Sequence, residues 1–216
     1  MKKYISFLIF IILIFIIMIF IFYFEKNKMY NNIKIDYNSI KVFYPSTSYE
    51  KLNKKIRKNI DAQLLEFKNI TLSDYKTNYY LIINYKEYKY KNIISYIFFS
   101  ESYIGGAHPI HLLWTINYDT NMNDFITIEN LTKKNKNILN DLSEYSYDFI
   151  SKKKEFKREN ILEMLKDGTR SLESNFKNIL FSRDGLILYF ERYQIAPYYY
   201  GDYNILIPYS DICLNI

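Results

Sequence analysis

The stretch at residues 92–118, NIISYIFFSESYIGGAHPIHLLWTINY, has the pattern of two strands joined by a turn. Its two ends are rich in β-branched and aromatic residues, which favour pleated, partly buried strands. From His111 to Tyr118 large apolar side chains occupy every other position, as in a sheet with one covered face. Gly105 and Gly106 lie between the two ends and can adopt backbone angles that other residues resist. The stretch therefore predicts two neighbouring strands joined by a glycine-dependent turn or bulge.

The segments before this pair predict a strand, a helix and another strand. Apolar residues recur every three or four positions from Tyr49 to Phe67, which is the period of an amphipathic helix. Thr47 and Glu50 match a capping box, in which the threonine hydroxyl accepts from a helical N–H and the glutamate reaches back. The two strands are predicted at 41–44 and 78–85.

The segments after the pair predict two helices and several short strands. The first helix has apolar residues spaced by four, three and four, and a shorter helix covers 161–166. Gly168 is suited to a left-handed stop for that second helix, and the Asp-Gly of residues 184–185 marks a hairpin. The apolar positions of the first helix are Ile138, Leu142, Tyr145 and Phe149, and strands are predicted at 125–128, 178–182, 186–193 and 203–208.

The order of these elements favours an α+β fold. Helices fall between groups of strands and do not alternate with each strand, which argues against a doubly wound parallel sheet. We expect a mainly antiparallel sheet packed with two or three helices.

The composition narrows the classes of function. The chain has 216 residues and a formal net charge of +6, and its basic residues are not gathered into one stripe, so nucleic-acid binding is not indicated. The single cysteine, Cys213, cannot form an intramolecular disulfide or a cysteine-cluster metal site. No Ser–His–Asp spacing or phosphate-binding glycine loop is present, and no cofactor is expected.

Residues 4–24 are almost entirely apolar and predict a membrane anchor. As a helix they span about 30 Å, the thickness of the hydrocarbon core of a bilayer. Bulky residues follow the run where a signal peptidase needs small ones, and Lys2 and Lys3 precede it. We expect a single-pass signal anchor in the cell membrane, with residues 1–3 in the cytoplasm. A tether at 25–39 then leads to an extracytoplasmic domain.

Three segments together resemble one protein family. Residues 94–131 combine a strand, a Gly-Gly-Ala-His turn and a strand ending in Asn-Tyr-Asp. Residues 175–212 combine an Asp-Gly hairpin with Tyr-Gln-x-Ala-Pro-Tyr and Ile-Pro-Tyr, and residues 42–56 resemble the small module that precedes them. The family is the RsiV-like or PdaC-like extracytoplasmic domain of unknown function. It is found in the anti-sigma factor RsiV and ahead of the catalytic domain of the peptidoglycan deacetylase PdaC.

The resemblance implies an envelope module that binds a ligand and has no catalysis of its own. In RsiV the domain acts as a receptor for lysozyme, so the expected ligand is a lysozyme-like muramidase or a peptidoglycan fragment of the cell wall. It also implies a small strand-helix-strand module at 40–90, followed by a C-terminal domain at 91–216.

Two loops are the candidate binding surfaces, one at 103–109 and one at 193–201. A rigid loop between strands can display binding residues, and tyrosine rings bring a large contact area with a polar tip. Tyr193 and Tyr198 are also suited to closing the core beneath the second loop. The candidate ligand-binding residues are Tyr103, Gly105, Gly106, His108, Pro109, Tyr193, Gln194, Pro197, Tyr199 and Tyr200.

A metal-dependent envelope hydrolase is the alternative function. His108 and His111 could bind a metal ion, with Glu101 or Asp119 as a third ligand. Residues three apart in an extended chain point to opposite faces, so a shared ion requires a turn at Pro109. In the structural interpretation, His108 instead hydrogen-bonds back to its own loop.

Overall fold

The computed structural model describes residues 31–37, 39–71, 79–212 and 214, and the statements below refer to these residues. A large sheet contains six strands in the order β1-β2-β3-β4-β5-β6. All neighbouring strands are antiparallel except β2 and β3, which are parallel and are linked through helix α2. The strands are β1 (Asn31–Tyr37), β2 (Ile40–Ser46), β3 (Tyr80–Tyr90), β4 (Ile93–Tyr103), β5 (Ile110–Asp119) and β6 (Asp124–Ile126).

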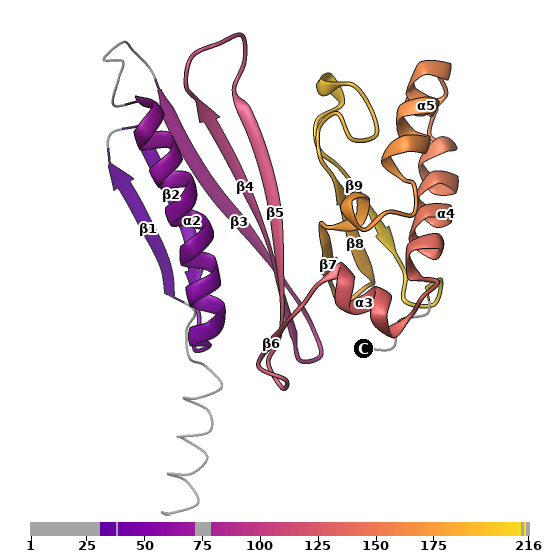
Figure 1. Ribbon diagram of the computed structural model, residues 1–216, viewed down its shortest axis with the longest axis horizontal. Helices are drawn as coiled ribbons and strands as arrows, with labels where there is room; N and C mark the ends of the chain where they lie inside the picture. The colour runs from indigo at the N-terminus through magenta and orange to yellow at the C-terminus, as the bar shows by residue number, and fades with distance from the viewer. Residues whose placement is uncertain (1–30, 38, 72–78, 213, 215–216) are drawn as a thin grey trace, which may run out of the picture.

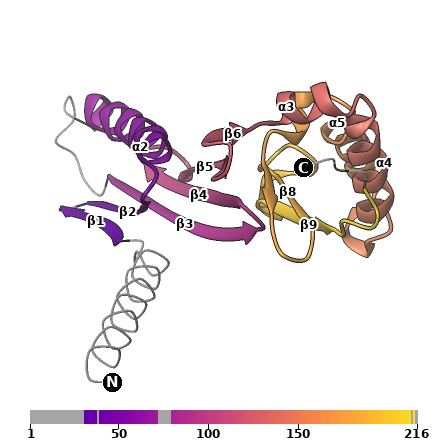
Figure 2. The same cartoon turned by 90° about the horizontal axis from the view of Figure 1, so that it is seen from below.

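A second, small sheet and three helices follow the large sheet. Figures 1 and 2 show the small sheet lying between the large sheet and helices α4 and α5, so the molecule has four layers. The small sheet is antiparallel and consists of β7 (Ile179–Phe181), β8 (Leu186–Phe190) and β9 (Tyr203–Ile207). The helices are α2 (Glu50–Thr71), α3 (Ile128–Lys134), α4 (Ile138–Ser151) and α5 (Glu159–Gly168).

Helix α2 covers one face of the large sheet and confirms the predicted amphipathic helix. Leu52, Ile56 and Ile60 are fully buried and belong to the same apolar cluster as Tyr96 and Phe98 of β4. Burying such side chains stabilises the fold by about 1.5–3 kcal/mol each. This helix therefore fixes the N-terminal part of the chain to the sheet.

The start of α2 differs from the predicted capping box. Thr47 Oγ1 accepts from the N–H of Tyr49 and donates to Asn53 Oδ1, while Asn53 Nδ2 donates to the carbonyl of Thr47 at 2.7 Å. Glu50 instead pairs with Arg57 on the surface of the helix. Asn53 Oδ1 accepts from the N–H of Thr47 at 2.8 Å and so takes the role predicted for Glu50. Its amide also donates, which a carboxylate cannot do.

The second face of the large sheet is also covered, although the alternation in 111–118 predicted one covered face. Leu113 packs with Leu180 and Tyr189 of the small sheet. Asn117 Nδ2 donates to the carbonyl of Ile179 at 3.0 Å, and the N–H of Phe181 donates to Ser95 Oγ at 3.0 Å. Asn117, which lies on the face that was not predicted to be covered, thus binds the backbone of β7, and Ser95 of β4 does the same.

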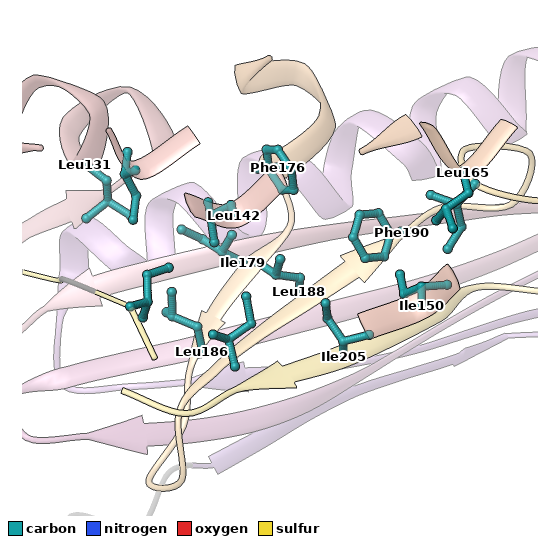
Figure 3. Close-up of a cluster of buried hydrophobic side chains, with 14 of the residues drawn as sticks. Leu131, Leu142, Ile150, Leu165, Phe176, Ile179, Leu186, Leu188, Phe190 and Ile205 are labelled. Carbon is teal, nitrogen blue, oxygen red and sulfur yellow. The ribbon is translucent and has the colours of Figure 1, made fainter. Parts of the chain in front are cut away.

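The largest apolar cluster lies between the small sheet and the helices. Figure 3 shows side chains of β7, β8 and β9 meeting those of α3, α4 and α5. The labelled members include Leu142, Ile150, Leu165, Leu188 and Phe190. This cluster is the main core of the C-terminal part of the chain.

The buried face of α4 is rotated relative to the predicted face. Ile138 and Leu142 are buried as expected, but the next buried residues are Ser146 and Ile150. Phe149 is exposed, and its ring stacks on Tyr145. Ser146 Oγ is buried and has no hydrogen-bond partner in the described part of the chain. The buried residues are thus spaced by four throughout, and one of them is polar. A search for recurring apolar residues cannot identify a serine as a core position.

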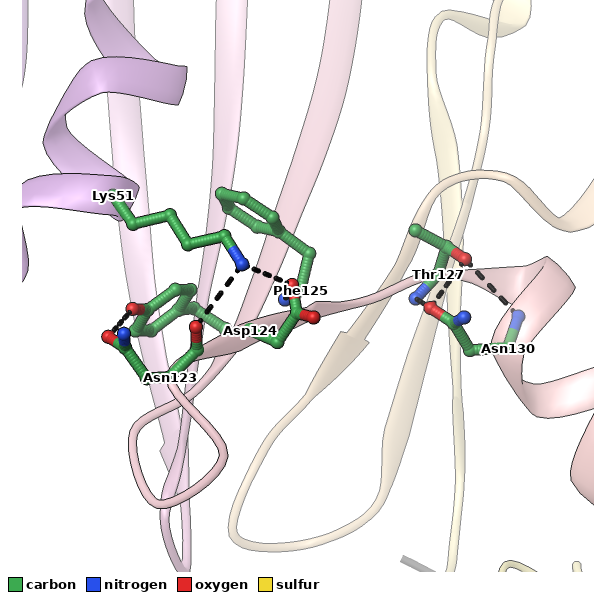
Figure 4. Close-up of polar contacts among 7 residues, drawn as sticks. Lys51, Asn123, Asp124, Phe125, Thr127 and Asn130 are labelled. Atoms are coloured by element: carbon green, nitrogen blue, oxygen red, sulfur yellow. Dashed lines mark hydrogen bonds and ion pairs between the residues drawn. The ribbon is translucent and has the colours of Figure 1, made fainter.

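Helix α3, which the sequence did not predict, is fixed at its start by a capping box. Thr127 Oγ1 accepts from the N–H of Asn130, and Asn130 Oδ1 accepts from the N–H of Thr127 (Figure 4). Close by, Lys51 of α2 donates to Asp124 at the end of the β5–β6 turn, at 2.8 Å. The turn is thereby attached to the first helix of the fold.

Gly168 is not the left-handed stop predicted for α5. Its φ angle is not among the positive ones, and it is the last residue of the helix. A Cβ atom at this position would lie 2.0 Å from the carbonyl oxygen of Gln194. Glycine is required because another segment of backbone approaches the helix closely.

The α+β class and the mainly antiparallel sheet are confirmed, with four described α-helices in place of the predicted two or three. Residues 31–37, predicted as part of the tether, form strand β1 because they pair with β2 along its length. The predicted boundary at 90/91 falls in the β3–β4 turn, so the two predicted parts share one sheet. Within the described residues no helix has the length and apolar character to cross a membrane, and the predicted anchor at 4–24 lies outside them.

We expect Gly168→Ala to lower the free energy of unfolding by about 1–3 kcal/mol, because the added methyl collides with the Gln194 carbonyl. At a helical residue with a negative φ, a glycine-to-alanine substitution normally makes a protein more stable. A loss of stability would therefore point to the collision with the Gln194 carbonyl. Chemical denaturation measures the change, and Lys166→Ala on the exposed side of the same helix serves as the control. A Gly168→Ala variant as stable as the parent would contradict the close approach.

We expect Ser146→Ala to raise the free energy of unfolding by about 1 kcal/mol, because it removes a buried hydroxyl that has no partner. Ser143→Ala, on a less buried position of the same helix, controls for the helix preference of alanine. Equal effects of the two substitutions in thermal or chemical denaturation would show that the Ser146 hydroxyl is satisfied.

Candidate functional site

The two loops predicted as binding surfaces lie against each other. One is the β4–β5 loop, residues 104–109, and the other is the β8–β9 loop, residues 191–202. Tyr198 OH donates to the carbonyl of Pro109 at 3.2 Å, and the Tyr198 ring lies 4.4 Å from the His108 ring between centroids. His111 also contacts Tyr198, at 6.2 Å between ring centroids. Tyr198 is therefore the residue that joins the loops.

The β4–β5 loop has the conformation that its glycines predicted. Gly105 and Gly106 have φ angles of 89° and 121°, which side chains with a Cβ rarely adopt. Tyr103 OH donates to the carbonyl of Gly106 at 3.1 Å. His108 Nδ1 lies 2.9 Å from the carbonyl oxygen of Pro109, in agreement with the structural interpretation of this histidine.

Gln194 fixes the β8–β9 loop to the body of the protein. Its Oε1 accepts from the N–H of Glu191, while Nε2 donates to the carbonyls of Gly168 and Asn175 at 3.0 and 2.9 Å. All of these partners are backbone groups of this chain. Gln194, predicted as a ligand-binding residue, is thus a residue that positions the loop.

A small cleft lies beside the junction of the loops, between the large sheet and the β8–β9 loop. Its volume is about 160 Å³. Three strands and one loop contribute to it, and its polar groups converge from both sides. The residues that define it are Ile82, Asn84, Phe99, Glu101, His111 and Asp202.

The polar groups of the cleft are held in place by hydrogen bonds. Tyr80 OH donates to Glu101 Oε1 at 2.6 Å, and the other carboxylate oxygen lies 3.7 Å from His111 Nδ1. Asp202 Oδ1 accepts from the N–H of Arg192 at 3.2 Å. The Arg192 guanidinium lies over the Tyr198 ring at 4.6 Å, and its Nε has no acceptor within the described residues. The cleft therefore presents two carboxylates and an imidazole in one small space, and Arg192 lies outside its lining.

His111 is predominantly neutral at pH 7. Burial lowers its pKa below the ordinary value of 6.5, and the positive charge of Arg192 lowers the pKa further. The carboxylates of Glu101 and Asp202 act in the opposite direction but do not reverse the shift. A neutral imidazole has one donor and one acceptor nitrogen, which suits hydrogen bonding to a polar ligand.

The remaining predicted ligand-binding residues do not line the cleft. Tyr193 was expected to close the core, but it is 60% exposed, and its backbone has a positive φ of 65°. Tyr200 OH donates to the carbonyl of Glu155, so this ring points toward the α4–α5 turn and away from the cleft. Tyr199 is 71% exposed beside it, and Pro197 precedes the short 3-10 turn of these tyrosines.

Sequence reasoning missed Tyr80, Asn84 and Arg192 as residues of the site. Tyr80 and Asn84 lie in the strand β3. The alternation of apolar and polar residues there shows that the two faces of the strand differ, but it does not show which face lines a site. Arg192 directly precedes the Tyr-Gln-x-Ala-Pro-Tyr motif, and that position is the one local signal that could have identified it.

The residues weighed as metal ligands do not gather. Asp119 lies at the far end of β5 from His111 and accepts from the N–H groups of Asn121 and Met122 in the turn. Over the described residues, no group of three or more His, Cys, Asp or Glu side chains could hold a metal ion. Glu101 is the one candidate third ligand that lies beside His111.

The sequence contains only two histidines, so the imidazole signals of His108 and His111 can be told apart and the pKa of His111 can be measured. We expect one imidazole signal in an NMR titration to have a midpoint below 6.5 and to vanish in His111→Gln. Because the unfolded state binds this proton more readily, His111 should make the protein less stable as the pH falls below 6.5. Thermal denaturation from pH 7 to pH 5 should show a smaller loss in His111→Gln than in the parent. A His111 midpoint at or above 6.5 would contradict the burial and the influence of Arg192.

Comparison with known proteins places this geometry in a family context. The peptidoglycan-N-acetylmuramic acid deacetylase PdaC of Bacillus subtilis is 29% identical over 174 residues, which are 78% of this chain and 37% of that protein. The chain therefore spans little more than a third of the length of this relative. Crystal structures of DUF3298 family proteins from Bacteroides fragilis and Pseudomonas aeruginosa have 18% and 14% sequence identity. Each covers 84% of this chain and 90% of the other, with a TM-score of 0.57, and shows the same fold.

A family model described as "Protein of unknown function (DUF3298)" matches residues 129–210, which run from α3 to just beyond β9. The match includes the β8–β9 loop and excludes the β4–β5 loop. The C-terminal part of the chain thus matches the DUF3298 model and the chain is similar to PdaC, whereas the RsiV-like features of the expected family stay a prediction.

Proposed function

We propose that this protein is a membrane-anchored, extracytoplasmic module of the cell envelope that binds a glycan fragment of peptidoglycan and does not catalyse a reaction. The observation that carries the proposal is the cleft, where Glu101, His111 and Asp202 converge. Ligand sites typically combine a concave surface with a few fixed polar groups. A sugar offers many hydroxyls for such groups and apolar faces for aromatic rings.

The chemistry of the cleft suits a polar, uncharged ring. The two carboxylates can accept hydrogen bonds from hydroxyls, and Asn84 and neutral His111 can both donate and accept. The hydrogen bond from Tyr80 to Glu101 fixes the orientation of the acceptor before a ligand arrives.

The envelope role is supported by the name of the relative. PdaC is named for the deacetylation of N-acetylmuramic acid in peptidoglycan, and this chain is similar to about a third of it. We propose that the shared part recognises the wall, while the reaction in that name belongs to the remainder of the relative.

The position of the chain's entry into the fold is consistent with an anchor at residues 4–24. Strand β1 begins at Asn31, which pairs with Ser46 at the end of the large sheet opposite the β4–β5 loop (Figure 1). A span placed before Asn31 leaves the cleft at the end of the domain that faces away from the membrane.

We expect Glu101→Gln to weaken binding of muramidase-released peptidoglycan fragments by about tenfold, because a hydrogen bond to a charged acceptor is lost. Isothermal titration with the full chain in a non-ionic detergent measures the affinity. Tyr147→Ala, on the exposed side of α4, is the control and should bind like the parent.

Three outcomes decide between ligands and functions. Fragment binding that Glu101→Gln leaves unchanged overturns the proposal for the cleft. No fragment binding, but saturable binding of a lysozyme-like muramidase, replaces the glycan with a protein ligand. Release of acetate or of cleaved sugar from the fragments overturns the non-catalytic role.

A further inference from the structure

The turn between α4 and α5 gathers basic side chains that the cleft does not use. Residues 152–158 read KKKEFKR, with five basic side chains and one carboxylate, so the segment has a formal charge of +4. Basic and acidic residues are mixed along the sequence as a whole, but no other described turn has such an excess of basic over acidic side chains. We call residues 152–158 the basic turn.

The basic turn is held rigidly on the surface of the protein. Phe156 is fully buried, and its ring contacts Tyr200 and Tyr203 at 5.3 and 5.0 Å between centroids. Tyr200 OH also donates to the carbonyl of Glu155 at 2.7 Å. The backbone that carries the neighbouring charges is therefore fixed before a ligand binds.

Two of the five basic groups already have partners. Lys152 pairs with Asp148 at 2.6 Å, and Lys153 lies over the Phe149 ring at 4.4 Å. The other three, Lys154, Lys157 and Arg158, are exposed, and none forms an ion pair with a carboxylate of the described chain. They remain available to an anion from outside.

The basic turn lies against the tyrosines of the β8–β9 loop. Tyr200 OH donates to the carbonyl of Glu155 within the turn. Tyr199 lies against Tyr200 at 4.8 Å between ring centroids. Tyr198 follows, in contact with the β4–β5 loop. The basic turn is thus linked through Tyr200, Tyr199 and Tyr198 to the loops beside the cleft.

We propose that the basic turn binds a phosphodiester-bearing anionic polymer of the cell wall, through Lys154, Lys157 and Arg158. A row of exposed cations on a rigid support attracts a flexible polyanion and contacts several of its charges at once. An anionic lipid surface is the weaker candidate, because the turn lies at the end of the molecule opposite Asn31, where the chain enters (Figure 1). The proposal rests on the extracytoplasmic role argued above.

The test is binding of poly(glycerol phosphate) chains to the full protein in a non-ionic detergent. We expect the triple substitution Lys154→Gln, Lys157→Gln and Arg158→Gln to weaken binding about tenfold at low salt, as exposed ion pairs contribute modestly but together. Binding by the parent should also fall steeply with added salt, because exposed charges are screened.

The matched control removes the same charge elsewhere. Lys54→Gln, Lys55→Gln and Lys58→Gln lie on the exposed side of α2 and should leave the affinity near that of the parent. Equal losses in the two triple variants would reduce the effect to net charge and overturn the proposal. Vesicles of anionic phospholipid that bind better than the polymer would also overturn it.

The two proposals fail separately. Glu101→Gln should not alter polymer binding, and the triple substitution in the basic turn should not alter binding of uncharged glycan fragments. Loss of fragment binding alone would therefore leave the basic turn standing, and loss of polymer binding alone would leave the cleft standing.

Discussion

The candidate site depends on the packing of the small sheet against the large one. Leu113, Leu180 and Tyr189 form the apolar part of this contact, and Ser95 and Asn117 add hydrogen bonds to the backbone of β7. Buried polar groups of this kind specify one alignment, because a shifted sheet leaves them without partners. The alignment places the β8–β9 loop over the ends of β3, β4 and β5, so the cleft arises where the second sheet stops.

The loops around the cleft are fixed mainly by backbone carbonyls. Gln194, Tyr198 and Tyr103 each direct a side-chain donor to the carbonyl of a neighbouring segment. Such contacts set the shape of the loops without using the charged side chains. Glu101 and Asp202 therefore line a prearranged site, and a ligand needs to order few groups when it binds.

Sequence reasoning succeeded where a local pattern decides the structure. Local patterns predicted the strands within 92–118, the turn at Gly105 and Gly106, and the helix after Thr47. Each pattern depends on residues close together in the sequence, and each element is confirmed. It failed where distant segments decide. Gly168 is needed because of Gln194, and the polar face of β5 is used by β7. The two loops of the site could be named individually, whereas their contact and the part played by Arg192 follow from the packing of the sheets.

The arrangement of β1 and β2 also has a mechanical consequence. β1 is an edge strand that pairs antiparallel with β2 over seven residues, starting at Asn31. A pull on the chain at Asn31, resisted by a ligand held at the opposite end of the sheet, runs parallel to the strands. It therefore loads all the ladder hydrogen bonds of β1 in shear at once and does not peel them one after another. The fold is suited to carrying tension between its two ends.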